Sequence, residues 1–264
     1  MANSVFFAWQ LDTPSENNKK FIWDALQRAA ENAAVPGKPE VSPRPESDTQ
    51  GMPGSPNIVD AIFKRIRACA VFVADLTFVG TTTGGKKKVP NPNVLIELGF
   101  AARSIGWDRT ILVLNDAYGA ADCLPFDILQ HRWPIVYRVT EKTEVRERRF
   151  ETLTAALEAA LRDCEQHTLT RASEMMAALD TACFAYIARN EATAHIGVPL
   201  PPRTRGDQLT GIDTNLVVRR LIELGALSVV TEPGLFYTWT YDGRRMIAQI
   251  NKAFPTLLPL LRRG

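Results

Sequence analysis

The chain has 264 residues, of which 45% are hydrophobic and 23% are charged, a composition typical of a soluble globular protein and unlike that of a disordered chain. The net charge of +2 gives no reason by itself to expect a nucleic acid or a membrane as a partner. No apolar run reaches the ~18 residues of a membrane-spanning helix and no secretory leader precedes the first expected strand, so we expect a cytoplasmic protein. The length predicts two domains, because one domain usually has ~100–200 residues.

The first part of the chain predicts a strand, a helix and a loop in that order. Residues 5–9 are apolar and rich in aromatics, as in a buried strand, and a polar segment follows at 10–18. Apolar residues then recur at helical spacing, which predicts a helix over 17–34. Residues 36–56 are rich in proline, glycine and serine, so we expect a loop there with at most a short strand near Val41.

A second helix and a buried strand are expected next. Ser55 is a suitable N-cap and Pro56 a suitable first residue for this helix. Residues 69–74 form a continuous apolar run that ends at Asp75, and fully buried parallel strands have this pattern. The buried face of the helix is predicted to contain Ile58, Ala61, Ile62 and Ile66.

A glycine-rich basic segment and an apolar helix follow. Residues 80–88, GTTTGGKKK, predict a flexible loop. The sequence PNPNVLIELGFA at 90–101 predicts a helix that runs to about Ile105, with Asn93 as its N-cap. Glu97 would then occupy the fourth position of this helix.

The remaining elements of the first domain complete an alternating pattern. Strands are predicted over 110–114 and 135–139, and a long amphipathic helix is predicted over 144–166. Strands and helices that alternate along the chain predict an α/β fold, in which helices cover both faces of a parallel sheet. Ligands bind such sheets outside the carboxyl ends of the strands, so Gln10 and Asp75 are expected to share one rim.

Beyond residue 168 the pattern changes. Helical periodicity over 172–188 is followed by a proline-rich segment, by a predicted helix over 214–224 and by a predicted hairpin over 227–241. A helix followed by a hairpin indicates a small second domain of a different class. We therefore divide the chain into domains 1–168 and 169–264.

Glu97 is a lone carboxylate in an apolar helix, with apolar neighbours in every direction round the helix axis. An unpaired charge is costly to bury, so this side chain is expected either to be desolvated or to be held by specific partners. One interpretation is a structural ion pair or a glutamate at the edge of the helix. The other is catalytic, with Glu97 facing the crevice where Asp75 also emerges. Two carboxylates in one cleft suit chemistry at an anomeric carbon, because one stabilises or attacks an oxocarbenium ion while the other organises a hydroxyl group.

Four sequence blocks resemble one family, and in chain order they read VFFAWQLD, DTQGMPGSPNI, VFVADLT and PNPNVLIELGFA. They look like the signature of the TIR-like predicted nucleotide-binding proteins of bacteria over about residues 4–140. The layout of the last two blocks is also similar to that of nucleoside deoxyribosyltransferases. The resemblance implies a flavodoxin-like sheet, cleavage of an N-glycosidic bond with NAD as the substrate, and a role in prokaryotic antiviral defence.

The resemblance also implies roles for residues. Glu97 matches the glutamate that these families use, and Asp75 matches the acidic residue that ends the preceding strand in the deoxyribosyltransferases. These two are the predicted catalytic residues. Ala8 departs from the family pattern, because many relatives carry serine there in an SWQ motif, which puts a hydroxyl contact at that position in doubt.

Further residues are candidates for binding a nucleotide, each with a structural alternative. Trp9 is suited to stack on a base, or it belongs to the core at the end of a buried strand, and Gln10 is suited to bond a ribose hydroxyl. The loop that contains Gly54 offers backbone amides to a phosphate, or it is an ordinary capped helix start. The lysines at 86–88 either steer an anionic ligand or are simply solvated. The predicted binding set is Trp9, Gln10, Gly54, Ser55, Asn57 and Asn93.

Other kinds of chemistry have little sequence support. The four cysteines lack the close pairs that zinc sites and redox motifs require, so we expect them to be reduced and structural. The three histidines lack metal-ligand spacing, and the sequence contains no GxSxG, Walker or GxGxxG pattern. We therefore expect neither a metal nor a resident cofactor. The cysteines are Cys69, Cys123, Cys164 and Cys183.

The second domain has a resemblance of its own. The sequence IDTNLVVRRLIELGALSVV, followed by EPGLFYTWTYDGRRMIAQI, resembles the recognition helix and wing of winged-helix domains, which implies a small α+β fold. The resemblance covers under half of domain 169–264. Its arginines either contact nucleic-acid phosphates from one face, or they are solvated on a module for oligomerisation or protein docking. They are Arg203, Arg205, Arg219, Arg220, Arg244 and Arg245.

Three functions follow as alternatives. The first is a TIR-like NAD glycohydrolase without a cofactor, whose second domain controls activity by self-association or through a partner protein. The second keeps the geometry but acts on a nucleoside or nucleotide, as in N-glycoside hydrolysis or deoxyribosyl transfer. The third is a non-catalytic nucleotide sensor, in which the second domain binds DNA or a protein. None of them requires a membrane.

Overall fold

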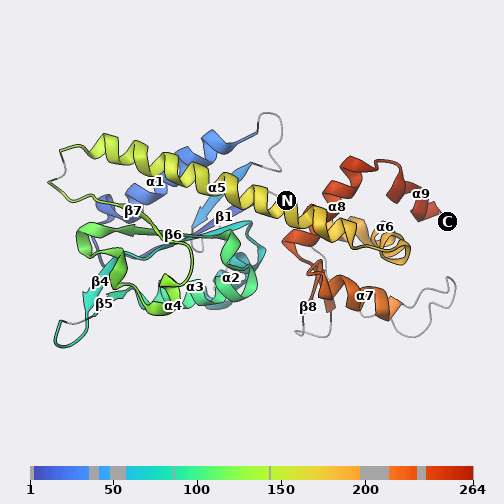
Figure 1. The fold of residues 1–264 in the computed structure, drawn as a ribbon, viewed down its shortest axis with the longest axis horizontal. Coiled ribbons are helices and arrows are strands. Elements are labelled where there is room, and N and C mark those ends of the chain that lie inside the picture. Colours follow the sequence, from blue (N-terminus) through green and yellow to red (C-terminus); the bar gives the residue numbers. More distant parts are fainter. Residues whose placement is uncertain are drawn as a thin grey trace. The chain divides into compact units, whose positions relative to one another are not determined.

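The structure is a computed structural model, and it divides into two compact units, Met1–Cys164 and Glu165–Gly264 (Figure 1). Each unit is described by itself. The domain boundary predicted at residue 168 falls inside a helix that begins in the first unit. The described residues are 3–35, 42–47, 58–85, 87–142, 144–196, 214–230 and 236–263.

The first unit contains a five-stranded sheet in which every pair of neighbouring strands is parallel. The strand order is β2-β1-β3-β6-β7, which is the 2-1-3-4-5 order of a flavodoxin-like core. The α/β class and the parallel sheet predicted from the sequence are therefore confirmed. The strands are β1 (Asn3–Ala8), β2 (Pro43–Ser47), β3 (Val71–Asp75), β6 (Thr110–Asn115) and β7 (Ile135–Tyr137).

Helices cover both faces of this sheet, with α1 and α5 on one side and α2 and α3 on the other (Figure 1). The two helices of the second face also pack on each other, since Phe63 of α2 stacks on Phe100 of α3 with ring centroids 4.2 Å apart. Three strands, β1, β3 and β6, are buried along almost their whole length, which explains their apolar runs. The helices are α1 (Lys19–Ala33), α2 (Ile58–Ala68), α3 (Pro92–Ser104), α4 (Phe126–Leu129) and α5 (Arg146–Ala177), with short 3-10 turns at Ser15–Asn17, Trp107–Arg109, Asp116–Tyr118 and Ala121–Cys123.

The proline-rich segment, expected to contain at most a short strand near Val41, contains one at Pro43–Ser47, and the basic segment expected to be a loop also contains strands. β2 lies within the proline-rich region, and its prolines at 43 and 45 are tolerated because β2 is an edge strand, where alternate residues need no ladder hydrogen bond. The basic segment 80–88 belongs to a hairpin of β4 (Phe78–Thr81) and β5 (Lys88–Pro90). The chain reverses there through Gly84 and Gly85, whose φ angles of 89° and 70° suit glycine. These strands are too short to produce a detectable alternation in the sequence.

Two details of the predicted helices are wrong. Ile58, expected on the buried face of α2, is 57% exposed, whereas Ala61 and Ile66 are buried. The predicted break after residue 166 does not occur, because α5 continues to Ala177 and α6 (Thr181–Ile196) follows. The break lies where Asp180 accepts a hydrogen bond from the backbone N–H of Cys183 at 2.7 Å, an N-cap interaction that the sequence reasoning missed.

The second unit packs helices around a two-stranded antiparallel hairpin. Its core includes Ile187 of α6, Leu221 of α7, Leu227 of β8 and Ile247 of α8, all of them buried. None of the helices in the described ranges is both long and apolar enough to span a bilayer. Besides α6, the elements are α7 (Thr214–Glu223), β8 (Leu227–Val230), β9 (Phe236–Trp239), α8 (Tyr241–Ala253) and α9 (Leu257–Arg263).

Candidate active site at the carboxyl end of the first strand

A pocket of about 270 Å³ lies at the carboxyl end of β1, next to the first turns of α3. We call it the β1–α3 pocket. In a sheet of this strand order, the connection after β1 leads to β2 on one side, and the connection after β3 leads to β6 on the other side. Ligands bind outside the carboxyl ends of the strands at such a point. The position of the pocket is therefore the one that the topology favours. Its polar lining residues are Trp9, Gln10, Asp12, Asn91, Asn93 and Glu97.

The fold brings four predicted site residues together at this pocket. Trp9 and Gln10 come from the segment after β1, and Asn93 and Glu97 come from α3. The predicted phosphate-binding residues Gly54, Ser55 and Asn57 lie outside the described residues.

The N-cap of α3 is Asn91, so the prediction that Asn93 caps the helix is wrong. Asn91 Oδ1 accepts hydrogen bonds from the backbone N–H groups of Asn93 at 2.8 Å and Val94 at 3.2 Å. Pro92 occupies the first helical position, where its missing N–H costs nothing, and the residue before such a proline is the one placed to cap. Glu97 is therefore the sixth residue of the helix instead of the fourth.

The sequence suggested that the helix carrying Glu97 is buried all round, but only one side of it is buried. The buried residues of α3 are Val94, Leu98 and Ala101, which form one stripe against the sheet, while Ile96 is 60% exposed. Glu97 is half-buried at the border of this stripe and lines the pocket. At this edge position the carboxylate avoids full desolvation, and it also lies on the wall of the pocket.

Asp75 lies at the end of β3 and is fully buried, but it does not line the pocket. Its Oδ1 accepts a hydrogen bond from the Thr77 N–H at 3.0 Å, and its Oδ2 accepts one from Gln10 Nε2 at 3.4 Å. The expected proximity of Gln10 and Asp75 is thus confirmed. Burial raises the pKa of Asp75 from 3.8 to about 6.

Gln10 is held on both sides of its amide. Its Nε2 also donates to Thr13 Oγ1 at 2.6 Å, and its Oε1 accepts from the Thr13 N–H at 3.0 Å. Both amide hydrogens are therefore used within the protein, by Thr13 and Asp75. Gln10 retains only acceptor capacity for a ligand, and Asp75 reaches the pocket through Gln10.

The raised pKa of Asp75 predicts a pH effect on stability. The folded chain holds this proton more tightly than the unfolded chain, so the contribution of the neutral carboxyl is full below about pH 4 and is lost as the pH rises through about 6. The unfolding free energy of Asp75→Asn minus that of the wild type is therefore expected to rise by about 3 kcal/mol between pH 4 and pH 7. Urea unfolding across this range measures the difference, and a difference that does not vary with pH would contradict the shift. Tyr137 does not titrate here, because burial and the Asp75 charge hold its pKa well above its ordinary value.

Two pocket residues, Asp12 and Asn91, were not singled out from the sequence. Asn91 Nδ2 donates to Asp12 Oδ2 at 2.6 Å across 79 positions of the chain. Asp12 belongs to the VFFAWQLD block and Asn91 to the PNPNVLIELGFA block, so their positions within two of the four motif blocks were a usable signal. Only the fold shows that they meet.

Trp9 is half-buried, and the ammonium of Lys19 lies 3.1 Å from its ring centroid. A cation at this distance interacts favourably with the indole face. Lys19 does not line the β1–α3 pocket, so it contacts Trp9 from outside the pocket. The interaction restrains the indole at the pocket wall.

The lysines and histidines considered from the sequence do not line this pocket where the structure describes them. Lys87 and Lys88 are beside the β4–β5 turn, and Lys86 lies outside the described residues. His131 stacks on Trp107 with ring centroids 3.8 Å apart. Within the described ranges, no group of three or more potential metal ligands is present, and the four cysteines are free.

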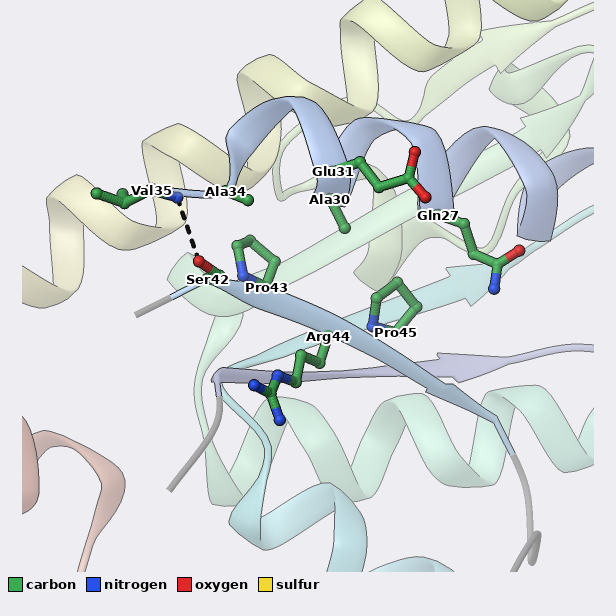
Figure 2. Close-up of a pocket in the computed structure, with 9 residues that line it drawn as sticks. All are labelled: Gln27, Ala30, Glu31, Ala34, Val35, Ser42, Pro43, Arg44 and Pro45. Carbon is green, nitrogen blue, oxygen red and sulfur yellow. Dashed lines mark hydrogen bonds between the residues drawn. The ribbon is translucent and has the colours of Figure 1, made fainter. Parts of the chain in front are cut away.

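A second pocket, of about 430 Å³, lies between the end of α1 and the edge strand β2 (Figure 2). Gln27 and Glu31 of the helix line one side, and Pro43 and Pro45 of the strand line the other. None of the predicted site residues that the structure describes lies there. The β1–α3 pocket is therefore the better candidate for chemistry.

Comparison of the sequence with protein-family models and with curated proteins finds no match. The function is therefore inferred from the residues of the β1–α3 pocket and from their charges.

Proposed function

We propose that the chain is a TIR-like NAD glycohydrolase with the β1–α3 pocket as its active site. The observation that carries the proposal is the position of Glu97, a carboxylate on the wall of a pocket that also contains an aromatic ring, at the carboxyl end of the sheet. This combination suits a ligand with a flat base and a sugar. The family resemblance of the four sequence blocks points to the same activity.

The charges of the pocket favour NAD over a neutral nucleoside. Among the described residues, those that line it include two carboxylates, Asp12 and Glu97, and neither a lysine nor an arginine. The ammonium of Lys19 contacts the Trp9 ring from outside the pocket. In NAD the nicotinamide ring is a cation, and the sugar becomes cationic as the glycosidic bond breaks. The negative charge of the two carboxylates favours binding of the cationic substrate, and Glu97 stabilises the cationic sugar as the bond breaks. A neutral purine or pyrimidine nucleoside lacks the first of these interactions.

The reaction proposed for this site is a hydrolysis. Trp9 packs against the nicotinamide ring, and Glu97 lies at the anomeric carbon. The bond between this carbon and the ring nitrogen breaks, and its electron pair makes nicotinamide neutral. The oxocarbenium ion is captured by the Glu97 carboxylate and then by water, or by water directly, and one proton is released. The products are nicotinamide and ADP-ribose.

Asp75 takes a supporting role in this proposal. It contacts Gln10 and does not line the pocket, so it orients the Gln10 amide instead of touching the sugar. Gln10 then offers its carbonyl oxygen to a ribose hydroxyl. This replaces the direct contact with substrate that the sequence resemblance implied for Asp75.

For the second unit we propose a winged-helix-like module that controls activity through self-association or a protein partner. The order of α7, the β8–β9 hairpin and α8 supports it. Two of the arginines considered for DNA binding are engaged inside the unit, since Arg245 pairs with Glu165 and Arg244 Nη1 donates to the carbonyl of Trp239 at 2.8 Å. Arg203 and Arg205 lie outside the described residues. A protein partner is thus better supported than DNA, and the control of an NAD-consuming enzyme fits an effector of antiviral defence.

Expression of the full chain in bacteria tests the proposed activity together with its alternatives. We expect cellular NAD to fall and ADP-ribose to rise, while pools of other nucleosides and nucleotides change less. Purified chain incubated with NAD should release nicotinamide. Loss of deoxynucleosides with NAD unchanged would favour deoxyribosyl transfer instead. Tight nucleotide binding without turnover, together with salt-sensitive duplex binding that Arg219→Ala and Arg220→Ala remove, would favour the sensor.

A further inference from the structure

We propose that Asp12 reads the ribose diol of the substrate and makes the β1–α3 pocket selective for ribosyl over 2′-deoxyribosyl ligands. The inference rests on the proposed function for its choice of ligand. It assigns to Asp12 a specificity that separates the two enzyme classes that the sequence resembles.

Two side-chain amides that line the pocket are hydrogen-bonded to other groups of the protein. The amide of Gln10 donates to Thr13 and Asp75, and the amide of Asn91 caps α3 with its oxygen and donates to Asp12 with its nitrogen. Of the three side-chain amides that the described residues contribute to the pocket, two are therefore occupied by protein groups. Recognition of the sugar hydroxyls therefore falls mainly to Asp12 and Asn93.

The Asp12 carboxylate is only partly engaged in hydrogen bonds with the described residues. Its Oδ2 accepts the 2.6 Å hydrogen bond from Asn91, whereas its Oδ1 has no partner among the described residues. The side chain is exposed at the pocket wall. An ionised carboxylate has about four acceptor positions on its two oxygens, so most of its capacity remains for a ligand.

Hydrogen bonds hold the side chains of Asn91 and Asp12 in place. Asn91 is fixed because its Oδ1 bonds two backbone N–H groups in the first turn of α3. Asp12 is in turn fixed by Asn91. The carboxylate, which belongs to the segment after β1, is therefore tied through Asn91 to the same helix that carries Glu97. A group held in this way recognises a ligand without a large cost in side-chain entropy.

The ligand group that suits this carboxylate is the diol of a ribose. Two adjacent ribose hydroxyls are both donors, and a carboxylate accepts both of them at once, as acidic residues do for ribose in dinucleotide sites. A 2′-deoxyribose has lost one of these donors. Since hydrogen bonds to a charged group are stronger than neutral ones, the missing hydroxyl is expected to weaken binding about 10-fold or more.

The experiment measures binding, so that it does not depend on turnover. Glu97→Gln protein is titrated calorimetrically with NAD and with the analogue that lacks the 2′-hydroxyl on the nicotinamide ribose. We expect the dissociation constant of NAD to be lower than that of the analogue by about 10-fold or more. Adding Asp12→Ala should bring this ratio close to one. The analogue that lacks the 2′-hydroxyl on the adenosine ribose serves as the control, and its affinity should stay near that of NAD.

A second variant separates recognition from folding. Asn91→Ser keeps a side chain that caps α3 but removes the donor to Asp12, so it should lower the ratio while leaving the far-ultraviolet circular dichroism unchanged. An unchanged ratio in Asp12→Ala, or no binding of NAD at all, would overturn the inference. If the wild type releases no nicotinamide but the ratio depends on Asp12, the proposed hydrolysis fails while ribose recognition by Asp12 stands.

Discussion

Substitution of Glu97 by glutamine is expected to lower the rate of nicotinamide release from NAD by about 100-fold or more, the range in which acid, base and nucleophilic groups act. Glutamine keeps the shape of the side chain but removes the charge that stabilises the oxocarbenium ion. Chromatography of nicotinamide and ADP-ribose gives the rate. The fold should be unaffected, because Glu97 is half-buried at the border of the buried stripe of α3.

A matched control for this variant is Glu151→Gln. Glu151 is an exposed glutamate of α5 in the same unit, and it does not line the β1–α3 pocket. It should retain the wild-type rate. Equal nicotinamide release by the wild type and Glu97→Gln would remove Glu97 from the mechanism. Equal loss in both variants would show that the glutamine substitution acts on folding.

Gly243→Ala is expected to destabilise the second unit by about 2 to 4 kcal/mol, through overpacking and loss of a helix cap. An added Cβ would lie 2.1 Å from the carbonyl oxygen of Ala226. This oxygen cannot move freely, because it accepts hydrogen bonds from the N–H of Thr240 at 3.0 Å and from its Oγ1 at 3.2 Å. The same Thr240 side chain caps α8 by accepting from the Gly243 N–H at 2.9 Å. Relief of the clash therefore breaks the cap or moves the first turn of α8 away from the backbone of Ala226.

Gly99→Ala is the control for this prediction. Gly99 lies on α3, is exposed, and has no atom within 4 Å of an added Cβ. Alanine is a better helix former than glycine, so this variant should gain up to about 1 kcal/mol. Urea unfolding of the full chain, followed by tryptophan fluorescence and circular dichroism, measures both changes. Unfolding of Gly243→Ala at the wild-type midpoint would show that the backbone near Ala226 adapts without cost.

Sequence patterns predicted the core of the first unit better than its edges. The apolar run at 69–74 became β3, and the helical spacing after residue 17 became α1, because a fully buried strand and an amphipathic helix each leave a strong periodic signal. The edge strand β2 and the β4–β5 hairpin left no such signal. β2 contains two prolines and pairs with β1, which is distant along the chain. β4 and β5 pair with each other but have only four and three residues.

The candidate site was predictable in part. The position of Glu97 in an apolar motif identified the residue, although two assumptions about its helix were wrong. The cap is Asn91, which a proline at the first helical position favours, and the helix is buried along only one stripe. The expected role of Asp75 depended on its direction after β3. In the structure this side chain turns to Gln10 and Thr77 and lies behind the pocket wall.

The sequence by itself determined the alternation of strands and helices, the burial of the central strands and the presence of a carboxylate in an apolar helix, because each of these is set by neighbours within one or two turns. Tertiary structure alone decided that Asn91 meets Asp12 across 79 positions, and that Gln10 stands between Asp75 and the pocket. Local periodicity specifies which face of an element is buried. It does not specify which strand ends become neighbours, and the chemistry of this site depends on those neighbours.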